Sequence, residues 1–384
     1  MKVIGVILMT MLTHSAYKGS KVLIALYALE FGAKPWMIGL LFTLYAVFSV
    51  MLSVVAGKAS DRYGFRLPLL FGACGLLAAL LVPYADPRLA ALFASAILAG
   101  VCYVFYTVPV QHLVGSFGEG TLRTRNYGWY SLGIGATALL GPMATGFAID
   151  TFGHRNTYLL LAAFLLIPIA VLLFFAHWIP RPKPVVAKPQ GQRIQDLFRQ
   201  GALTRVLITG GIVETGLELI NFYMPIYAKT QGLTASQIGI VMGCYAVAML
   251  IMRALLPVYT RHVGEVRLLM ISLLTTAAVS LMIPLVAGFG PIAAMAFLLG
   301  VGLGCCSPLS LILVYNLSPD GRAGEAIGVR QSINKATETV MPMVFGVVAT
   351  FTGAGVVFWM TGALIFAGSW IMWRDVRLTP NKEW

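Results

Sequence analysis

The stretch GKASDRYGFR, residues 57–66, is a short polar loop between two long apolar runs. It places one carboxylate, Asp61, among three cations, with glycines at its first and eighth positions. The flanking runs, 36–57 and 67–84, contain no charged residue. Each has the length of about 20 residues with which a helix crosses a bilayer core. We therefore expect the loop to join two membrane-spanning helices.

The composition extends this conclusion to the whole chain. Of its 384 residues, 59% are hydrophobic and only 11% charged, and the mean hydropathy is +0.85. A soluble domain carries about 25% charged residues. We predict an all-α polytopic membrane protein with twelve transmembrane helices. The expected spans are 3–29, 36–57, 67–84, 89–112, 127–149, 157–179, 203–228, 235–259, 267–287, 291–315, 326–351 and 355–373.

One long polar stretch separates the spans into two groups of six. Residues 180–202 are basic and rich in proline, which is typical of a stiff linker. The predicted domains are an N-terminal six-helix bundle, 1–179, a cytoplasmic linker, 180–202, and a C-terminal six-helix bundle, 203–384.

Lysines and arginines outside the spans lie mainly on one side of the predicted topology. With the N-terminus in the cytoplasm, eighteen lie inside and four lie outside. The positive-inside rule then predicts a multi-pass plasma-membrane protein, in a prokaryotic inner membrane, with both termini cytoplasmic. The net charge of +13 is explained by this topology, so no nucleic-acid partner is expected.

The five cysteines all lie within predicted spans, so neither disulfides nor a metal site are expected. The sequence contains no nucleophile and base set and no phosphate-binding loop. We therefore expect no enzymatic activity and no cofactor. The protein is expected to be a monomer.

An internal repeat relates the two groups of spans at a constant offset of 200 residues. Because each group has an even number of spans, the two six-helix repeats run parallel. Identical pairs include Tyr27 and Tyr227, Gly32 and Gly232, Tyr45 and Tyr245, Gly64 and Gly264, Gly128 and Gly328, Pro142 and Pro342, and Gly153 and Gly353.

The loop at 57–66 resembles the G-x-x-x-D-R-x-G-x-[RK] motif of the major facilitator superfamily, in the position between spans two and three. The resemblance implies that fold over nearly the whole chain, a solute site between the halves, and alternating access. Turn geometry and topology alone could also produce such residues. The family often has a cation at the position of Phe65, so we expect Arg62 or Arg66 to supply the positive charge of the latch instead. The conformational latch implied by the motif comprises Gly57, Asp61, Arg62, Gly64 and Arg66.

The fifth span resembles, in part, the Gly-Pro motif of proton-coupled exporters in this family. Close helix packing explains its glycines about equally well. Exporters of drugs in exchange for protons also tend to carry an arginine in span four, and 94–110 contains none. The residues concerned are Gly133, Gly135, Gly141, Pro142 and Gly146.

Charged residues within the spans are the candidates for function, because each costs about 2.5–3.5 kcal/mol at the bilayer centre without water or a partner. In span one, His14, Lys18 and Lys21 form one helical stripe. In span seven, Glu214, Glu218 and Asn221 occupy the equivalent positions. Span eight adds Arg253, and span eleven adds Arg330, Asn334, Lys335 and Glu338.

These side chains divide into two expected roles. Cations outnumber carboxylates, which favours anionic or zwitterionic substrates. The alternative is that the charges only neutralise one another, Lys18 with Glu218 and Lys335 with Glu338. The expected substrate-binding residues are Lys18, Lys21, Arg253, Arg330, Asn221 and Asn334. The expected proton-coupling residues, which can change protonation between states, are His14, Glu214, Glu218 and Glu338.

The sequence therefore predicts a secondary active transporter for a small organic solute, working by alternating access and coupled to protons. In one hypothesis, an anionic substrate takes Lys18 or Lys21 away from Glu218, which then binds a proton. The alternative function is efflux of drugs or metabolites by proton antiport. The expected partners are the small-molecule substrate, the proton and the lipid bilayer.

Overall fold

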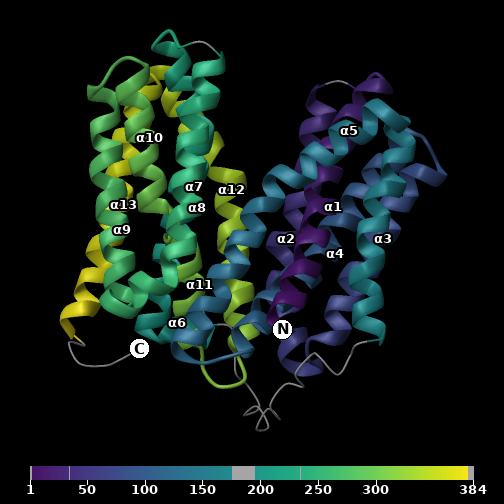
Figure 1. The fold of residues 1–384 in the computed structure, drawn as a ribbon, viewed down its shortest axis with the longest axis horizontal. Helices are drawn as coiled ribbons and strands as arrows, with labels where there is room; N and C mark the ends of the chain where they lie inside the picture. Colours follow the sequence, from purple (N-terminus) through teal and green to yellow (C-terminus); the bar gives the residue numbers. More distant parts are fainter. Residues whose placement is uncertain (1, 34, 175–194, 234, 379–384) are drawn as a thin grey trace. The chain divides into compact units, whose positions relative to one another are not determined.

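The computed structural model describes residues 2–33, 35–174, 195–233 and 235–378, and within these ranges the regular structure is helical (Figure 1). Most of the predicted linker lies outside the described residues. The elements are α1 (Lys2–Glu30), α2 (Pro35–Tyr63), α3 (Arg66–Ala85), α4 (Leu89–Ser116), α5 (Gly120–Phe174), α6 (Gln195–Arg199), α7 (Gly201–Thr230), α8 (Ala235–Val263), α9 (Glu265–Met282), the 3-10 turn η2 (Ile283–Leu285), α10 (Phe289–Gly304), α11 (Cys306–Leu317), α12 (Ala323–Thr352) and α13 (Ala354–Leu378).

These helices correspond to the expected spans, with two differences at the boundaries. The fifth and sixth spans form the single element α5, which changes direction at Gly153, where φ is 77°. The expected span 291–315 is divided at Cys305 into α10 and α11. Phe289–Leu317 as a whole is nevertheless long and apolar enough to cross a membrane.

Helix packing divides the chain into two compact units. The first contains Met1–Glu119, Trp129–Pro189 and Pro319–Lys335, and the second contains Gly120–Gly128, Gln190–Ser318 and Ala336–Trp384. Each unit therefore includes a short segment from the other half of the sequence. As a result, α5 and α12 both pass from one unit into the other. The domain boundaries at 179 and 203 stay a prediction.

The repeat is also visible in the backbone. Glycines with positive φ recur at the 200-residue offset, at turns where a side chain would strain the left-handed conformation. Contacts recur as well, since α4 packs against α2 and α3, and α10 packs against α8 and α9. The glycine pairs are Gly32 (72°) with Gly232 (79°), Gly64 (78°) with Gly264 (82°), and Gly153 (77°) with Gly353 (85°).

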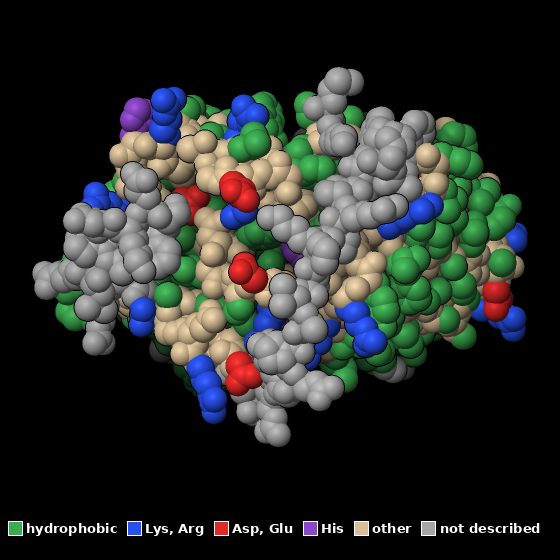
Figure 2. Space-filling view, turned by 90° about the horizontal axis from the view of Figure 1, so that it is seen from below, with side chains coloured by type: hydrophobic (Ala, Val, Ile, Leu, Met, Phe, Trp, Pro, Cys, Tyr) green, Lys and Arg blue, Asp and Glu red, His purple; other side chains and the backbone are tan. Residues whose placement is uncertain are grey.

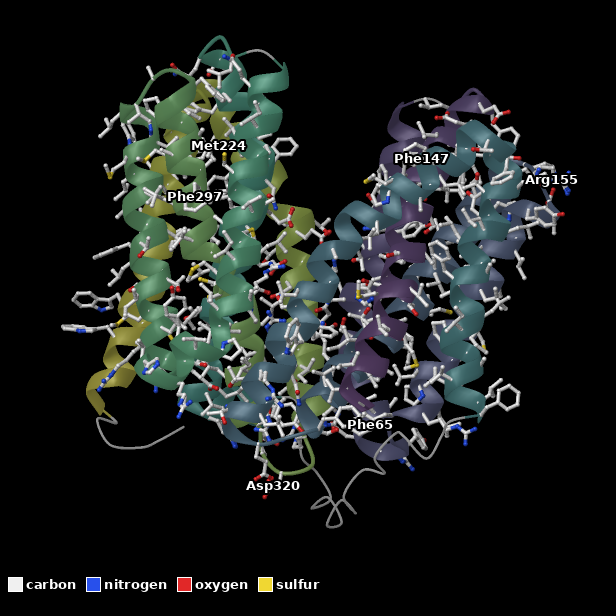
Figure 3. All side chains as sticks on the ribbon, in the orientation of Figure 1. Phe65, Phe147, Arg155, Met224, Phe297 and Asp320 are labelled. Carbon is white, nitrogen blue, oxygen red and sulfur yellow. The ribbon has the colours of Figure 1, made fainter. Side chains whose placement is uncertain are left out.

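The core of the first unit lies between α1, α2, α3, α4 and the second half of α5. Figure 3 marks its two ends with Phe65 and Arg155. Large apolar side chains such as Met51 and Phe147 remain exposed, as expected for a surface that faces lipid. Fully buried core residues include Leu23, Leu41, Leu76, Leu92 and Leu161.

Charged side chains gather at the helix ends. Figure 2 looks onto the end at which Phe65 lies, where lysine, arginine and a few acidic side chains are visible, together with areas of hydrophobic side chains. Exposed arginines at the ends of α2 and α8 and the starts of α3 and α9 include Arg62, Arg66, Arg261 and Arg267.

Within the first unit, α1 and α5 approach each other through glycines. A Cβ atom at Gly141 would lie 2.7 Å from the carbonyl oxygen of Ser15, and one at Gly133 would lie 2.9 Å from Cγ2 of Ile7. At Gly146 nothing lies within 4 Å of the same position. Close packing therefore accounts for two glycines of the exporter-like motif.

Substituting alanine at these glycines should separate packing from helix propensity. Gly141→Ala forces the Ser15 backbone away, and overpacking of this kind costs typically about 1–3 kcal/mol. Gly146→Ala meets no neighbour and gains up to about 1 kcal/mol of helix propensity. We expect a lower melting temperature for the first variant and an unchanged or higher one for the second in purified protein. Equal melting temperatures would contradict the close contact between α1 and α5.

Candidate functional site

Asp61, near the end of α2, binds the N-terminus of α12 within the first unit. Its Oδ1 accepts the N–H of Gly324 and its Oδ2 accepts that of Glu325, each at 2.9 Å. The first N–H groups of a helix have no partner within the helix, and the helix dipole favours a negative charge there. With an exposed fraction of 3%, Asp61 is a buried carboxylate that caps a helix distant in sequence.

Glycines allow α2 and α12 to cross closely beside this cap. A Cβ atom at Gly324 would lie 2.6 Å from the carbonyl oxygen of Gly57, and one at Gly328 would lie 2.9 Å from Cα of Val54. Gly57 thus has a direct steric role, because a side chain here would push α12 away from Asp61. Gly64, with φ of 78°, forms the turn that leads into α3.

A buried ion pair lies next to Asp61. Glu325, which is 1% exposed, accepts a hydrogen bond from Nε of Arg322 at 2.8 Å. Nζ of Lys58 lies 3.5 Å from the other oxygen of Glu325. Buried charges require compensation by groups of opposite charge. Here the cations of Lys58 and Arg322 and the dipole of α12 offset the charges of the carboxylates Asp61 and Glu325.

His112 of α4 and Phe65 complete the surroundings of Asp61. Nδ1 of His112 lies 3.1 Å from the Ser60 hydroxyl and 3.5 Å from Oδ1 of Asp61. Phe65 is buried and packs edge-on against the His112 ring, with 4.8 Å between centroids. The aromatic ring at position 65 thus covers the histidine and shields it from solvent.

Arg62 and Arg66 take other partners. Nε and Nη2 of Arg66 donate to the carbonyl oxygens of Leu172 and Leu173 at 3.0 and 3.1 Å. These carbonyls belong to the last turn of α5, where the helix dipole favours a cation. The guanidinium of Arg62 lies 5.2 Å from the ring centroid of Tyr63. Both arginines are exposed, and the cations beside the buried carboxylates are those at positions 58 and 322.

Further along the first unit, the two lysines of α1 contact a backbone carbonyl and aromatic rings. Nζ of Lys18 donates to the carbonyl oxygen of Ile134 in α5 at 3.3 Å. Nζ of Lys21 lies 5.2 Å from the ring centroid of Tyr17 and 5.8 Å from that of Tyr45. Both distances fall within the range of about 6 Å for a cation over an aromatic ring. Carbonyl oxygens and rings solvate an ammonium group without cancelling its charge.

His14 lies close to these cations. The side chain is 3% exposed, and the charges of both Lys18 and Lys335 act on it. The charge of Arg330, which is on the same helix as Lys335, acts on Tyr130. Positive charges from α1 and α12 are therefore concentrated in the first unit.

Four predicted residues of α12 are divided between the units. Arg330, Asn334 and Lys335 belong to the first unit, whereas Glu338 follows the boundary and belongs to the second. Arg330 and Asn334 are 4% and 6% exposed. The two ion pairs considered from the sequence, Lys18 with Glu218 and Lys335 with Glu338, each join residues of different units and stay predictions.

In the second unit, carboxylates occupy the equivalent stripe. Glu214 and Glu218 of α7 both act electrostatically on Tyr245 of α8, and Glu214 also acts on Arg253. Nε of Arg253 donates to the carbonyl oxygen of Gly304 at 3.3 Å. Gly304 ends α10, so Arg253 places its charge at a helix C-terminus, where the dipole favours it. Asn221, the last member of the stripe, is exposed.

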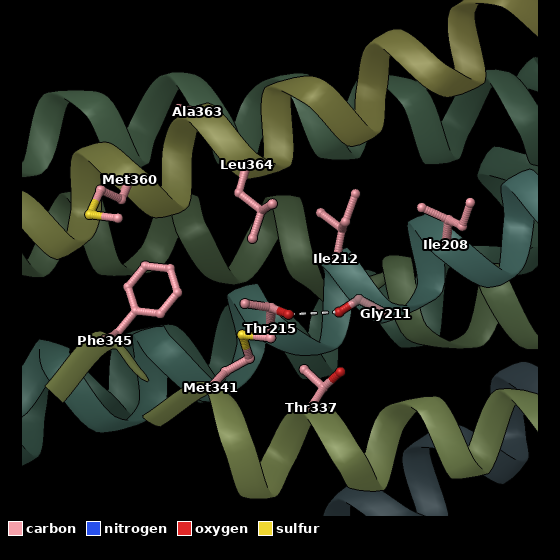
Figure 4. A pocket seen from close by; sticks show the side chains of 10 residues that line it. All are labelled: Ile208, Gly211, Ile212, Thr215, Thr337, Met341, Phe345, Met360, Ala363 and Leu364. Atoms are coloured by element: carbon pink, nitrogen blue, oxygen red, sulfur yellow. Dashed lines mark hydrogen bonds between the residues drawn. The ribbon is translucent and has the colours of Figure 1, made fainter. Parts of the chain in front are cut away.

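A separate pocket of about 570 Å³ lies among α7, α12 and α13 of the second unit (Figure 4). Its volume is in the range of about 300–1,000 Å³ that is usual for small-molecule sites. Two threonines supply its polar side chains, and the Thr215 hydroxyl donates to the Gly211 carbonyl at 2.9 Å. The lining contains no residue predicted from the sequence. It consists of Ile208, Gly211, Ile212, Thr215, Thr337, Met341, Phe345, Met360, Ala363 and Leu364.

Asp61→Asn tests the cap on α12. Asparagine keeps one acceptor but loses the charge and turns a donor towards a backbone N–H. Loss of a cap costs about 0.5–2 kcal/mol, so we expect a lower unfolding temperature of the purified protein. Asp86→Asn is the matched control, because Asp86 is a partly exposed carboxylate that pairs locally with Arg88. Equal effects of the two substitutions would rule out the cap.

Comparison with known proteins was made by sequence and by structure. The model of the Major Facilitator Superfamily matches residues 6–337 and 206–383. Multidrug resistance protein MdtG of Proteus mirabilis is 26% identical over 385 residues, covering 93% of this chain and 91% of the relative. MdtG of Dickeya zeae is 25% identical, covering 90% and 86%.

Solved structures share the fold at low identity. A bacterial homologue of the iron transporter ferroportin, in an outward-facing state, has a TM-score of 0.83 at 16% identity, covering 97% of this chain and 99% of the other. The human organic anion transporter MFSD10 has a TM-score of 0.74 at 17% identity, covering 96% and 98%. With the family model matched along nearly the whole chain, the protein belongs to the major facilitator superfamily and is a multi-pass membrane transporter of small molecules, not an enzyme.

Proposed function

We propose that this transporter exports a small anionic or zwitterionic organic solute by alternating access, driven by protons. The observation that carries the proposal is the different charge of equivalent stripes: the cations Lys18 and Lys21 in the first unit correspond to the carboxylate Glu218 and the neutral Asn221 in the second. Charged groups at membrane depth are costly and are kept where they bind a substrate or an ion.

The first unit supplies the features needed for an anion. Lys18 and Lys335 act together on His14, so their fields add in one region. The contacts of Lys18 and Lys21 with a carbonyl oxygen and with tyrosine rings hold the ammonium groups in place. A carboxylate or phosphate oxygen binds an ammonium group as a compact point charge. Arg330 and Asn334 are proposed as further ligands, as are Arg253 and Asn221 in the second unit.

The second unit supplies candidates for the proton. Burial favours the neutral form of a carboxyl group and a nearby cation favours the charged form, so a carboxylate beside a cation can switch when its surroundings change. Glu214, which interacts with Arg253, meets this description. Glu218 lies one turn further along the same helix and is the second candidate. Glu338 and His14 are the remaining candidates. Proton binding at these groups would couple solute movement to the proton gradient.

The names of the relatives support a direction of transport and a location. MdtG proteins of two bacteria are named as multidrug resistance proteins, which supports export from the cell. We infer a bacterial inner-membrane location, a monomer, and both termini in the cytoplasm, because the positive-inside rule gives that orientation. The motif residues Gly57, Asp61, Arg62, Gly64 and Arg66 would then lie at the cytoplasmic end, where Asp61 serves as the latch on α12.

A second candidate function is efflux of lipophilic drugs. The apolar pocket in the second unit favours it, because its lining offers contact area and two threonine hydroxyls but no charge. The names of the relatives agree with this candidate as well. The two candidates differ in the ligand they predict: an anion at the lysines, or an uncharged or cationic lipophile at the pocket.

Lys18→Ala should abolish stabilisation by anions. The measurement is a thermal-shift screen of detergent-purified protein against mono- and dicarboxylates, sugar phosphates, amino acids and lipophilic cations. A ligand at about 100 times its Kd stabilises the folded state by about 2.7 kcal/mol, which raises the melting temperature by several degrees. Arg88→Ala is the control, because Arg88 is an exposed cation of the same unit.

The same screen decides between the two candidates. Stabilisation by lipophilic cations alone, with no response to anions, would overturn the anion proposal and leave drug efflux. A Lys18→Ala protein that no longer folds would indicate that the lysine is structural. Lys21→Ala then provides an independent variant at the neighbouring cation.

Glu218→Gln should uncouple transport from protons. Liposomes that contain the protein and the pH dye pyranine are mixed with the solutes that stabilise it, and the internal pH is followed. Wild-type protein should give a solute-dependent pH change, and the Gln variant should behave like protein-free liposomes, because an amide does not bind a proton at neutral pH. Glu119→Gln, at an exposed carboxylate, should match the wild type. An unchanged pH response would exclude Glu218 as the proton carrier.

A further inference from the structure

The first turn of α5 is held in the second unit by a ring of four side chains. Oγ1 of Thr124 donates to Oε1 of Glu265 at 2.7 Å, and Nδ2 of Asn316 donates to Oε2 of the same carboxylate at 3.0 Å. Nη1 of Arg123 donates to the amide oxygen of Asn316, which closes the ring. Three helices, α5, α9 and α11, therefore meet at one carboxylate.

The charges within this ring are balanced. Arg123 acts electrostatically on Glu265, and its guanidinium lies 4.4 Å from the ring centroid of Tyr315. Glu265 is also the first residue of α9, where the helix dipole favours a negative charge. Hydrogen bonds to an ionised group are about twice as strong as those between neutral groups. The negative charge of Glu265, to which Thr124 donates and on which Arg123 acts, is thus offset within the ring.

The repeat relates this ring to the contact made by Asp61. At the 200-residue offset, Thr124 corresponds to Gly324, whose N–H binds Asp61. The residue equivalent to Asp61 itself is Arg261, so the acidic residue of the motif is missing from the second half. Glu265 lies four residues later, beyond the turn at Gly264 that separates α8 from α9, and supplies the carboxylate from a new position.

Packing next to the two contacts is also equivalent. A Cβ atom at Gly128 would lie 3.6 Å from the carbonyl oxygen of Arg253, and Gly328 meets the carbonyl oxygen of Ser53 closely. Positions 128 and 328, like 53 and 253, are related by the offset. Both α5 and α12 are therefore held by a carboxylate and a glycine contact at equivalent places.

We propose that Glu265 and Asn316 form a second latch, which holds the first turn of α5 and replaces the missing acidic residue of the motif. Because α5 continues from Gly128 into the first unit, a movement of one unit relative to the other has to release Arg123 and Thr124 or bend the helix. Glu265 is thus a positioning residue for the transport cycle. The inference rests on the alternating-access part of the proposed function, and not on the charge of the solute.

Release of the turn can be measured by the reactivity of a buried reporter cysteine. Asn126 lies on the same turn and is 5% exposed, so Asn126→Cys reacts with N-ethylmaleimide only when the turn is released. The experiment uses full-length purified protein in which Cys74 and Cys244 are replaced by serine, because the other cysteines are buried. Loss of hydrogen bonds to the carboxylate should raise the labelling rate roughly tenfold or more in Glu265→Ala.

Further variants identify the ring as the cause. Glu265→Gln keeps one acceptor, so its labelling rate should lie between those of wild type and Glu265→Ala. Thr124→Val, which preserves shape, should accelerate labelling by itself but add nothing to Glu265→Ala, because the two residues share one bond. Glu119→Ala, at an exposed carboxylate close by, should leave the rate unchanged.

A reporter elsewhere in the second unit excludes a general loss of stability. Ser280 of α9 is fully buried, and Ser280→Cys should stay protected in every variant. An equal rise in labelling at both reporters, or unchanged labelling of Asn126→Cys in both Glu265→Ala and Thr124→Val, would overturn the proposal. The assay needs no substrate, so failure to find a stabilising anion would not affect it, and failure of the latch would leave anion binding intact.

Discussion

A charge buried among membrane-spanning helices has to find its partner within the protein, because hydrocarbon provides none. Both units meet this requirement largely with the polar ends of backbone segments. Asp61 takes two N–H groups at the start of α12, and Arg253 takes a carbonyl at the end of α10. Lys18 takes a carbonyl of α5. Helix termini and carbonyls stabilise these charges through the dipoles of the backbone.

The overall architecture could be read from the sequence because hydropathy reports directly which segments enter the bilayer. The spans, the repeat and the family motif all followed from local patterns. The helix breaks at Gly153 and Cys305 were harder to predict, because the hydropathy of the sequence does not change at these positions. Whether a helix continues at such a point depends on φ and on close contacts with neighbouring helices, and neither is a property of composition.

The site was only partly accessible from sequence for a related reason. Asp61 was indicated by its motif, but its partners at positions 324 and 325 lie far away in the chain and join it only through the crossing of α2 and α12. Arg66 was indicated by the same motif, and its contacts with carbonyls of α5 were not evident from the sequence. Glu265 was not indicated by the motif because it begins the next helix, four residues after the position that the motif specifies. Pairing of side chains across helices depends on rotation and register, which residue spacing does not report.

The division of α5 and α12 between the units has a consequence for how such a chain could arise. Each sequence half contributes one short segment to the unit built by the other, Gly120–Gly128 and Pro319–Lys335, and the two segments overlap in the repeat. Two copies of a six-helix ancestor would make the same exchange as a symmetric, swapped dimer. Joining the copies by a linker turns that association into an intramolecular one, with a high effective concentration of each turn for its partner. Once joined, the two halves can diverge in sequence. One unit can then hold α12 through the cap by Asp61, while the other holds α5 through the side-chain ring around Glu265.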